Sequence, residues 1–105
     1  MCQLEDLGSK LQVFAARRKW EGFHTPKNLA MALASEAGEL LAEFQWLTPD
    51  ESNVDALSIE QSEAIRLEIA DVFLYLVRLA DSLHVDLYEA AFSKLLINER
   101  RFPES

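Results

Sequence analysis

Cysteine, glycine, proline and basic residues are all scarce in this sequence of 105 residues, and each shortage excludes a class of protein. The single cysteine, Cys2, cannot support an internal disulfide framework. Three glycines and three prolines beside 50% hydrophobic residues argue against a disordered chain. Ten basic residues face 18 acidic ones, and the resulting net charge of −8 disfavours binding to a polynucleotide.

Long apolar runs are missing as well. No stretch reaches the roughly 18 uninterrupted apolar residues that suggest a membrane span. Residues 1–10 lack the basic and apolar regions of a signal peptide. We therefore expect a cytoplasmic protein without membrane contacts, folded as a single domain over residues 1–105.

Apolar residues recur at helical spacing along four segments, and none of them shows the alternation typical of strands. Thr25, Ser58 and Asp86 each have the sequence pattern of a helix N-cap. The pattern predicts an all-α, four-helix bundle with a mobile polar loop over residues 51–57. The helices are expected over residues 3–20, 26–47, 58–84 and 86–100.

The third predicted helix is apolar almost all round. Between residues 69 and 80 only Asp71 and Arg78 are strongly polar. Such a helix is normally buried on every side. Because a chain this short cannot supply so much cover by itself, we expect an obligate oligomer.

Carboxylates interrupt the apolar stripes of the second and third helices. Burying an unpaired carboxylate costs several kcal/mol, and gathering like charges raises that cost unless protons or cations intervene. Two pairs, each spaced one helical turn apart, would put hard oxygen ligands on neighbouring helices. With no cysteine beside them they suit Mg²⁺, with Mn²⁺ as a possible substitute, better than zinc. The inward acids are Glu36, Glu39 and Glu43 on the second helix, and Glu68 and Asp71 on the third.

Two other interpretations of these acids are open. They could form an ordinary solvated helix face, as single E-x-x-E pairs often do. They could also hold a di-iron centre, but that site uses Glu-x-x-His pairs. The one comparable spacing, Asp81-x-x-His84, lies at a helix end, where His84 is better explained as a C-terminal cation or hydrogen-bonding residue.

Several motifs in the same order resemble the MazG-like all-α nucleoside triphosphate pyrophosphohydrolases. Glu36, Glu39, Glu68 and Asp71 match the E-x-x-E and E-x-x-D signature of that family. Residues 18–28, 75–77 and 93–103 are similar to its dCTP pyrophosphatase branch. The resemblance covers nearly everything between residues 17 and 103. Phe102 departs from it by standing where relatives often carry tyrosine, so the base preference can differ.

The resemblance implies a Mg²⁺-dependent hydrolysis of a nucleoside triphosphate to the monophosphate and pyrophosphate. The substrates would be dCTP-like or modified pyrimidine deoxynucleotides, removed in house-cleaning of the nucleotide pool. It also implies a tetramer built as a dimer of dimers, with sites lined by more than one subunit. The implied metal ligands are Glu36, Glu39, Glu68 and Asp71. The implied substrate contacts are Trp20 and Trp46 around the base, His24 and Tyr75 in the nucleotide pocket, and Lys94 and Asn98 at the nucleotide and its phosphates.

Catalysis is expected to depend on Glu36 and Glu39. Glu39 is our choice for the group that accepts the proton of the attacking water, with Glu43 as the neighbouring alternative. Lys94 would neutralise charge on the departing pyrophosphate.

Two other functions compete with this one. A non-catalytic helical interaction module would explain the apolar third helix but not the inward acids. A related dUTPase or phosphoribosyl-ATP pyrophosphohydrolase would share both the helical bundle and a metal site built from carboxylates.

Overall fold

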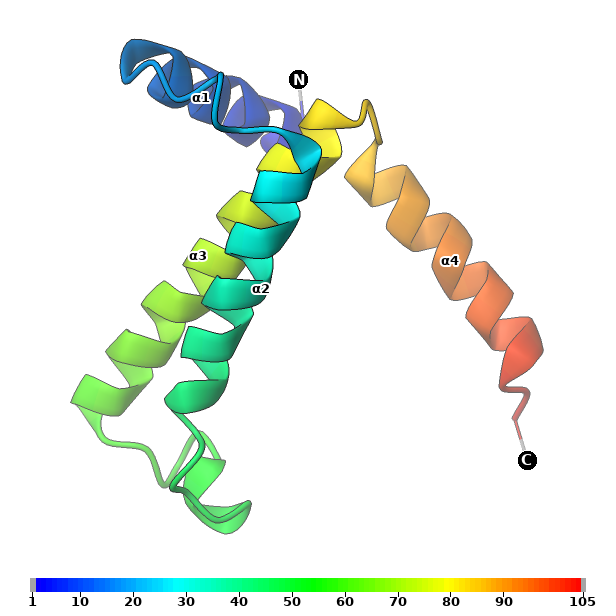
Figure 1. Ribbon diagram of the computed structural model, residues 1–105. Coiled ribbons are helices and arrows are strands. Elements are labelled where there is room, and N and C mark those ends of the chain that lie inside the picture. Colours follow the sequence, from blue (N-terminus) through cyan, green and yellow to red (C-terminus); the bar gives the residue numbers. More distant parts are fainter. Residues whose placement is uncertain (1, 105) are drawn as a thin grey trace.

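Four α-helices and one short 3-10 helix make up the computed structural model, which describes residues 2–104 (Figure 1). No strand occurs in that range, so the predicted all-α class with four helices is confirmed. None of the helices described is long and apolar enough to cross a membrane. The elements are α1 (Gln3–Arg17), α2 (Pro26–Ala42), η1 (Asp50–Ser52), α3 (Ile59–Ser82) and α4 (Leu87–Arg101).

The three predicted N-caps are confirmed. Thr25 Oγ1 accepts a hydrogen bond from the backbone N–H of Asn28 at 3.2 Å, which opens α2. Ser58 and Gln61 form a reciprocal capping box at the start of α3. Asp86 Oδ1 caps α4. Each cap supplies a partner to an N–H group that the first helical turn leaves free.

The first and third helices end earlier than their apolar patterns predict. Lys19 and His84 adopt left-handed backbone conformations, with φ of 58° and 56°. The backbone turns back after each of them. The N–H of Trp20 bonds to the carbonyl of Ala15 at 3.0 Å, and the N–H of Val85 bonds to the carbonyl of Ala80 at 2.9 Å. A left-handed residue closed by this bond is a common helix stop.

The second helix also stops short of the predicted Leu47. From Glu43 onward the backbone bonds run to the residue three positions earlier, as in Phe44 to Leu41 at 2.9 Å. The apolar spacing continues, but the α-helical hydrogen bonding does not. The polar loop that follows contains η1, held by reciprocal bonds between Thr48 and Glu51.

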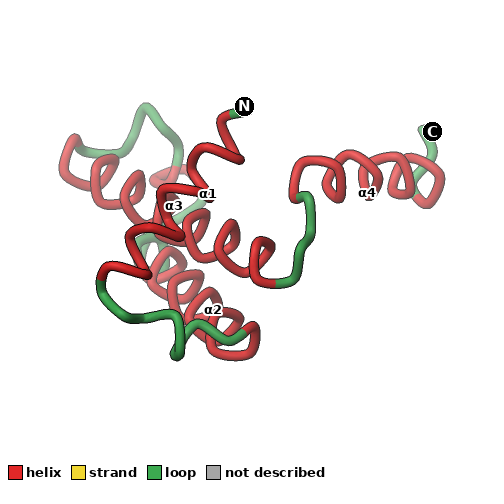
Figure 2. The backbone as a smooth tube through the Cα atoms, turned by 90° about the horizontal axis from the view of Figure 1, so that it is seen from above, coloured by secondary structure: helices red, strands yellow, loops and turns green. Residues whose placement is uncertain are grey.

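Helices α2 and α3 lie antiparallel along most of their length, and α1 crosses the C-terminal half of α3 (Figures 1 and 2). Gly8 is buried at this crossing, where an added Cβ atom would lie within 2.7 Å of Asp81 Oδ2 and the Asp81 side chain would have to move. A small core sits between the three helices and contains Ala15, Leu29, Ile65, Val77 and Ala80.

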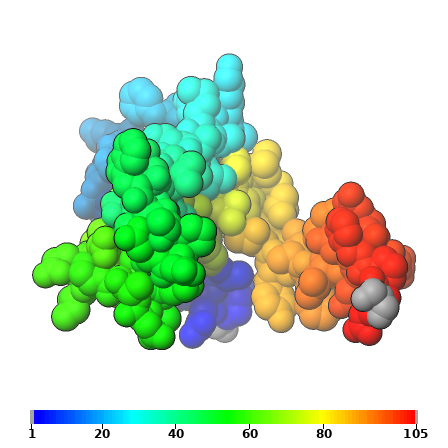
Figure 3. Space-filling model, turned by 90° about the horizontal axis from the view of Figure 1, so that it is seen from below, coloured from blue at the N-terminus to red at the C-terminus, as the bar shows by residue number. Residues whose placement is uncertain are grey.

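Helix α4 projects away from the other three, and Figure 3 shows its C-terminal part, in red, standing clear of them. Helix α3 is only partly covered within the single chain, where Ile69 is 54% exposed and Phe73 39%. The reason is that no element of this chain covers that side of α3 among the residues described. This is the situation in which the sequence pattern calls for a second subunit, and the oligomer stays a prediction. The large apolar side chains left exposed include Leu67 on α3 and Tyr88, Phe92, Leu95, Leu96 and Ile97 on α4.

Candidate active site

Three predicted metal ligands meet where α2 packs against α3. One carboxylate oxygen from each of Glu36, Glu39 and Glu68 lies within 4.8 Å of the other two. The first two acids are one helical turn apart on α2, so they share a face, and the antiparallel packing places Glu68 of α3 opposite them. Three oxygen donors are thus available to one small cation.

The fourth predicted ligand, Asp71, does not belong to this group of three. It lies about one turn further along α3, and its side chain is exposed. Its charge nevertheless helps to raise the pKa of both Glu36 and Glu68. Asp71 therefore borders the cluster, and its role as a ligand stays a prediction.

The cluster contains two buried oxygen atoms without hydrogen-bond partners, Glu36 Oε2 and Glu68 Oε2. Leaving a buried acceptor unsatisfied costs about 1–3 kcal/mol, and more when it is charged. The ion pairs found within residues 2–104, Lys10–Asp6 and Arg66–Glu63, lie on the surface. No lysine or arginine of that range neutralises the cluster. A divalent cation with oxygen ligands fits this donor set, because it would satisfy both orphaned oxygens.

Burial and crowding raise the pKa of two of these acids. Desolvation is the largest cause of the raised pKa of Glu36, followed by a hydrogen bond and charge repulsion shared with Glu39. For Glu68, desolvation again comes first, and the charge of Glu39 comes second. The half-buried Glu43 adds to the repulsion on Glu68. A bound cation would reverse these shifts, because it favours the charged form.

A hollow of about 230 Å³ opens beside the cluster, between the end of α1, the α1–α2 connection and α3. Trp20, His24 and Tyr75, three of the residues predicted to bind a nucleotide, line it together with Asp71. Its remaining surface is mostly apolar. The structure thus places a largely apolar pocket next to a group of acids, and Asp71 borders both.

Aromatic rings form one side of the hollow. The rings of Phe14 and Trp20 meet edge to face with centroids 5.6 Å apart, and the ring of His24 follows at 6.0 Å from Trp20. The left-handed turn at Lys19 brings this segment back, and the N–H of His24 bonds to the carbonyl of Trp20 at 3.1 Å. Trp20 remains 42% exposed, so part of its surface is free to meet a ligand.

Arg78 is a pocket residue to which the sequence reasoning gave no role. Its Nε–H donates a hydrogen bond to His24 Nδ1 at 3.3 Å. Burial is the main cause of the lowered pKa of His24, and the positive charge of Arg78 adds to it. One sequence signal was present, because Arg78 is the only basic residue between positions 69 and 80.

The other three predicted substrate contacts do not line this hollow in the single chain. Trp46 follows the end of α2 and is 87% exposed. Lys94 and Asn98 are on α4, which points away from α2 and α3 (Figure 1). Their contacts with a nucleotide stay predictions, and they require a second chain or a different position of α4.

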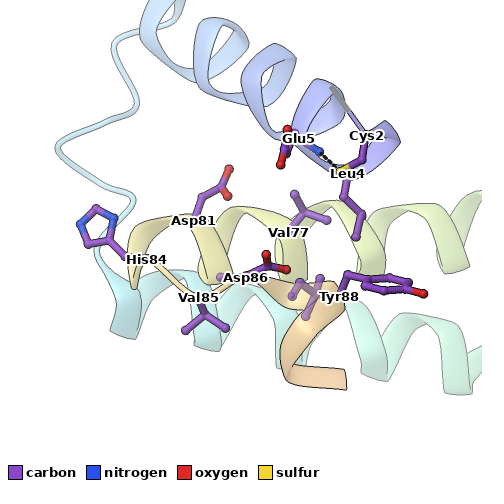
Figure 4. Close-up of a pocket in the computed structure, with 11 residues that line it drawn as sticks. Cys2, Leu4, Glu5, Val77, Asp81, His84, Val85, Asp86 and Tyr88 are labelled. Carbon is purple, nitrogen blue, oxygen red and sulfur yellow. Dashed lines mark hydrogen bonds between the residues drawn. The ribbon is translucent and has the colours of Figure 1, made fainter. Parts of the chain in front are cut away.

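A second hollow, of about 260 Å³, lies where the N-terminus of α1 meets the end of α3 and the start of α4 (Figure 4). Cys2 caps α1 there, and its Sγ accepts a bond from the N–H of Glu5 at 3.4 Å. Asp81 and His84, the pair considered for an iron centre, line this hollow. Within residues 2–104 they join no group with metal-ligand spacing, so the acids of α2 and α3 remain the candidate metal centre.

Comparison with known proteins gives consistent matches. Residues 31–104 match the model of the MazG-like family. Over 100 residues the chain is 46% identical to human dCTP pyrophosphatase 1 and 44% identical to that of Mus musculus. These alignments cover 95% of this chain but only 59% of each relative, so the chain spans about three fifths of their length. The crystal structure of a pyrophosphatase from Archaeoglobus fulgidus superposes with a TM-score of 0.89 at 36% identity, covering 99% of this chain and 95% of that one.

Proposed function

Because this chain belongs to the MazG-like family, we propose that it is a metal-dependent pyrophosphohydrolase of nucleoside triphosphates. One observation carries the proposal: Glu36, Glu39 and Glu68 converge between two packed helices and keep two buried oxygens without partners. In a non-catalytic interaction module, these buried and unpaired carboxylates would lower the stability of the fold without any compensating function. The names of the dCTP pyrophosphatase relatives and of the Archaeoglobus pyrophosphatase support it.

The proposed substrates are dCTP-like or modified pyrimidine deoxynucleotides, removed in house-cleaning of the nucleotide pool. The relatives are named for dCTP, and the hollow beside the acids presents an aromatic wall. Stacking a base on such a wall contributes roughly 1–3 kcal/mol and discriminates poorly between bases. Selectivity between bases would therefore depend on hydrogen bonds from polar atoms of His24 and Tyr75. A cytoplasmic location stays a prediction.

The proposed cofactor is Mg²⁺, with Mn²⁺ as a possible substitute, held by Glu36, Glu39 and Glu68 with Asp71 at the border. A divalent cation supplies charge neutralisation of phosphate oxygens and Lewis acidity towards a water molecule. The protein would contribute orientation of the triphosphate and a proton acceptor. Glu39 fits the acceptor best, because its side chain is exposed while it belongs to the cluster. Glu43, half-buried one turn away, is the alternative.

A second copy of this chain would complete the site. The exposed apolar side chains of α3 and α4, among them Ile69 and Phe92, have no cover within residues 2–104. We propose that they pack between subunits of a tetramer, a dimer of dimers. Helix α4 of one subunit would then bring Lys94 and Asn98 to the phosphates bound by another. Lys94 would offset the charge of the departing pyrophosphate.

A substrate panel with product identification tests the proposed function. We expect the monophosphate and pyrophosphate from pyrimidine deoxynucleoside triphosphates when Mg²⁺ is present, and no turnover after chelation. The panel includes dUTP and phosphoribosyl-ATP, because preferential hydrolysis of either would identify the related enzyme class instead. Release of single phosphate, or no product from any nucleotide, would contradict the proposal.

A further inference from the structure

The contact between Arg78 and His24 joins two residues that lie 54 positions apart in the sequence. Both line the hollow beside the acid cluster, next to Trp20 and Tyr75. We propose that Arg78 is a positioning residue that fixes the tautomer of His24, so that His24 offers an Nε2–H donor to a carbonyl acceptor on the substrate base. The inference rests on the proposed function for the identity of the ligand.

The direction of the hydrogen bond determines the tautomer. A guanidinium group has only donors and stays protonated in proteins. His24 Nδ1 accepts from Arg78 Nε at 3.3 Å, so this nitrogen must keep its lone pair. A neutral imidazole with a free lone pair on Nδ1 carries its hydrogen on Nε2. Burial and the neighbouring positive charge lower the pKa of His24, which also favours the neutral ring.

No other partner accounts for Arg78. It makes no ion pair with any acid between residues 2 and 104, although Asp71 lines the same hollow. A half-buried arginine in an otherwise apolar stretch is unfavourable unless its donors are used. In the structure, the guanidinium group of Arg78 uses a donor in the hydrogen bond to His24.

The backbone holds His24 in place for this purpose. Its N–H bonds to the carbonyl groups of Trp20 and Glu21 at 3.1 and 3.2 Å, directly before the cap of α2. With the backbone anchored and Nδ1 engaged, the ring loses the freedom to exchange its donor and acceptor. A fixed donor favours bases that present a carbonyl acceptor, as pyrimidines do at C2, over adenine, which has no carbonyl group.

Nuclear magnetic resonance tests the tautomer directly. In protein labelled with ¹⁵N at histidine, we expect the His24 ring to carry its hydrogen on Nε2. Arg78→Met keeps an unbranched apolar stem in the same surroundings but removes the guanidinium donors, so the His24 spectrum should shift towards a mixture of tautomers. Arg66→Met, the same exchange at the exposed surface of α3, should leave it unchanged. A hydrogen on Nδ1 in the wild type would overturn the inference.

Kinetics test whether the tautomer matters for selectivity. Arg78→Met should lower the preference for pyrimidine over adenine triphosphates, measured as the ratio of kcat/KM values, about fivefold to tenfold, which is the usual effect of one hydrogen bond. In a His24→Ala background the same change should have no further effect. Arg78→Lys, which keeps a charged donor, should restore part of the preference.

Equal losses in both backgrounds would show that Arg78 contacts the substrate itself, and the inference would be wrong. An unchanged preference in Arg78→Met would overturn it as well. If every variant and the wild type hydrolyse no nucleotide, the proposed function fails. The ¹⁵N spectra then still decide whether Arg78 sets the tautomer of His24.

Discussion

At the scale of single residues, Glu36 and Glu68 are the acids whose surroundings are least suited to a carboxylate. Each has a buried oxygen without a partner, and each has a raised pKa because of desolvation and neighbouring charges. Natural proteins retain such arrangements mainly at functional sites, where ligand binding repays the cost. The positions of these acids within apolar stripes identified them from the sequence, but spacing along a helix does not show how deeply each side chain is buried.

Glu39→Gln removes the proposed proton acceptor while keeping the shape of the side chain. We expect kcat/KM to fall about 10²–10⁴-fold, as for the loss of a general base or a charged ligand. The matched control is Glu63→Gln on the exposed face of α3, which should leave turnover unchanged. Steady-state assays of pyrophosphate release check both variants. Equal activity of the two would favour the interaction module.

The acid cluster also predicts how stability depends on pH. Because the folded-state pKa of Glu36 lies above its ordinary value of 4.5, the folded protein binds more protons than the unfolded chain between these two values. Stability from this group is therefore fully present below pH 4.5 and is lost as the pH rises through the folded-state pKa. Glu68 acts in the same direction.

Glu36→Gln should accordingly reduce this loss. In metal-free protein the melting temperature of the variant should exceed that of the wild type above the window and approach it below pH 4.5. Adding Mg²⁺ at neutral pH should raise the melting temperature of the wild type far more than that of the variant. Thermal unfolding at several pH values, with and without Mg²⁺, measures both effects. A constant difference across the pH range would contradict the assigned pKa direction.

At the scale of elements, the helix ends place the pocket. The stop of α1 at Arg17 and the left-handed turn at Lys19 fold Trp20 back against Phe14. The apolar pattern ran on to Trp20, so spacing alone overestimated this helix. Left-handed positions usually carry glycine, and a lysine there gives no signal in the sequence.

Lys19→Gly should therefore stabilise the protein. Glycine adopts a positive φ without steric cost, so we expect a gain of about 0.5–1 kcal/mol in the free energy of unfolding. Lys19→Ala removes the same charge but keeps the strained turn, and it should give no gain. Chemical denaturation measures the three proteins. A loss of stability in Lys19→Gly would show that this turn carries no strain.

At the scale of the whole molecule, residues 2–104 leave α3 partly uncovered and most of α4 projecting away from the other helices. Ile69 and Phe73 on α3, and Phe92 and Leu95 on α4, are exposed in a protein of 11.9 kDa. An exposed apolar surface of this kind normally marks an interface. Lys94, which is predicted to assist the acids, lies on the same projecting helix α4.

Phe92→Glu should convert the proposed tetramer into smaller species, because it places a charge in an apolar interface. Lys10→Glu, at an exposed polar position of α1, is the control. Light scattering after size-exclusion chromatography gives the masses. A wild-type monomer with full activity would contradict the shared site.

Mixing variants tests the shared site more directly. Glu39→Gln and Lys94→Ala should each have low activity alone. Mixed oligomers should recover part of it, because some sites would combine an intact acid cluster with an intact lysine. Activity that stays at the sum of the separate variants would place Lys94 and Glu39 in the same subunit's site.

The sequence by itself determined the helices, their caps at Thr25, Ser58 and Asp86, and the face on which Glu36, Glu39 and Glu68 lie. These features follow from the repeat of the helix and from contacts between residues three or four positions apart. They are local, so spacing reveals them.

Only the tertiary structure decided where α1 and α3 stop, which acid oxygens are buried without partners, and that Arg78 meets His24. It also showed that α4 projects away from the helices that carry the acids. The helix ends are local turns at Lys19 and His84, residue types that do not mark a left-handed position, whereas the other properties depend on how segments far apart in the chain pack. Periodicity within one helix carries no information about the surface that covers it.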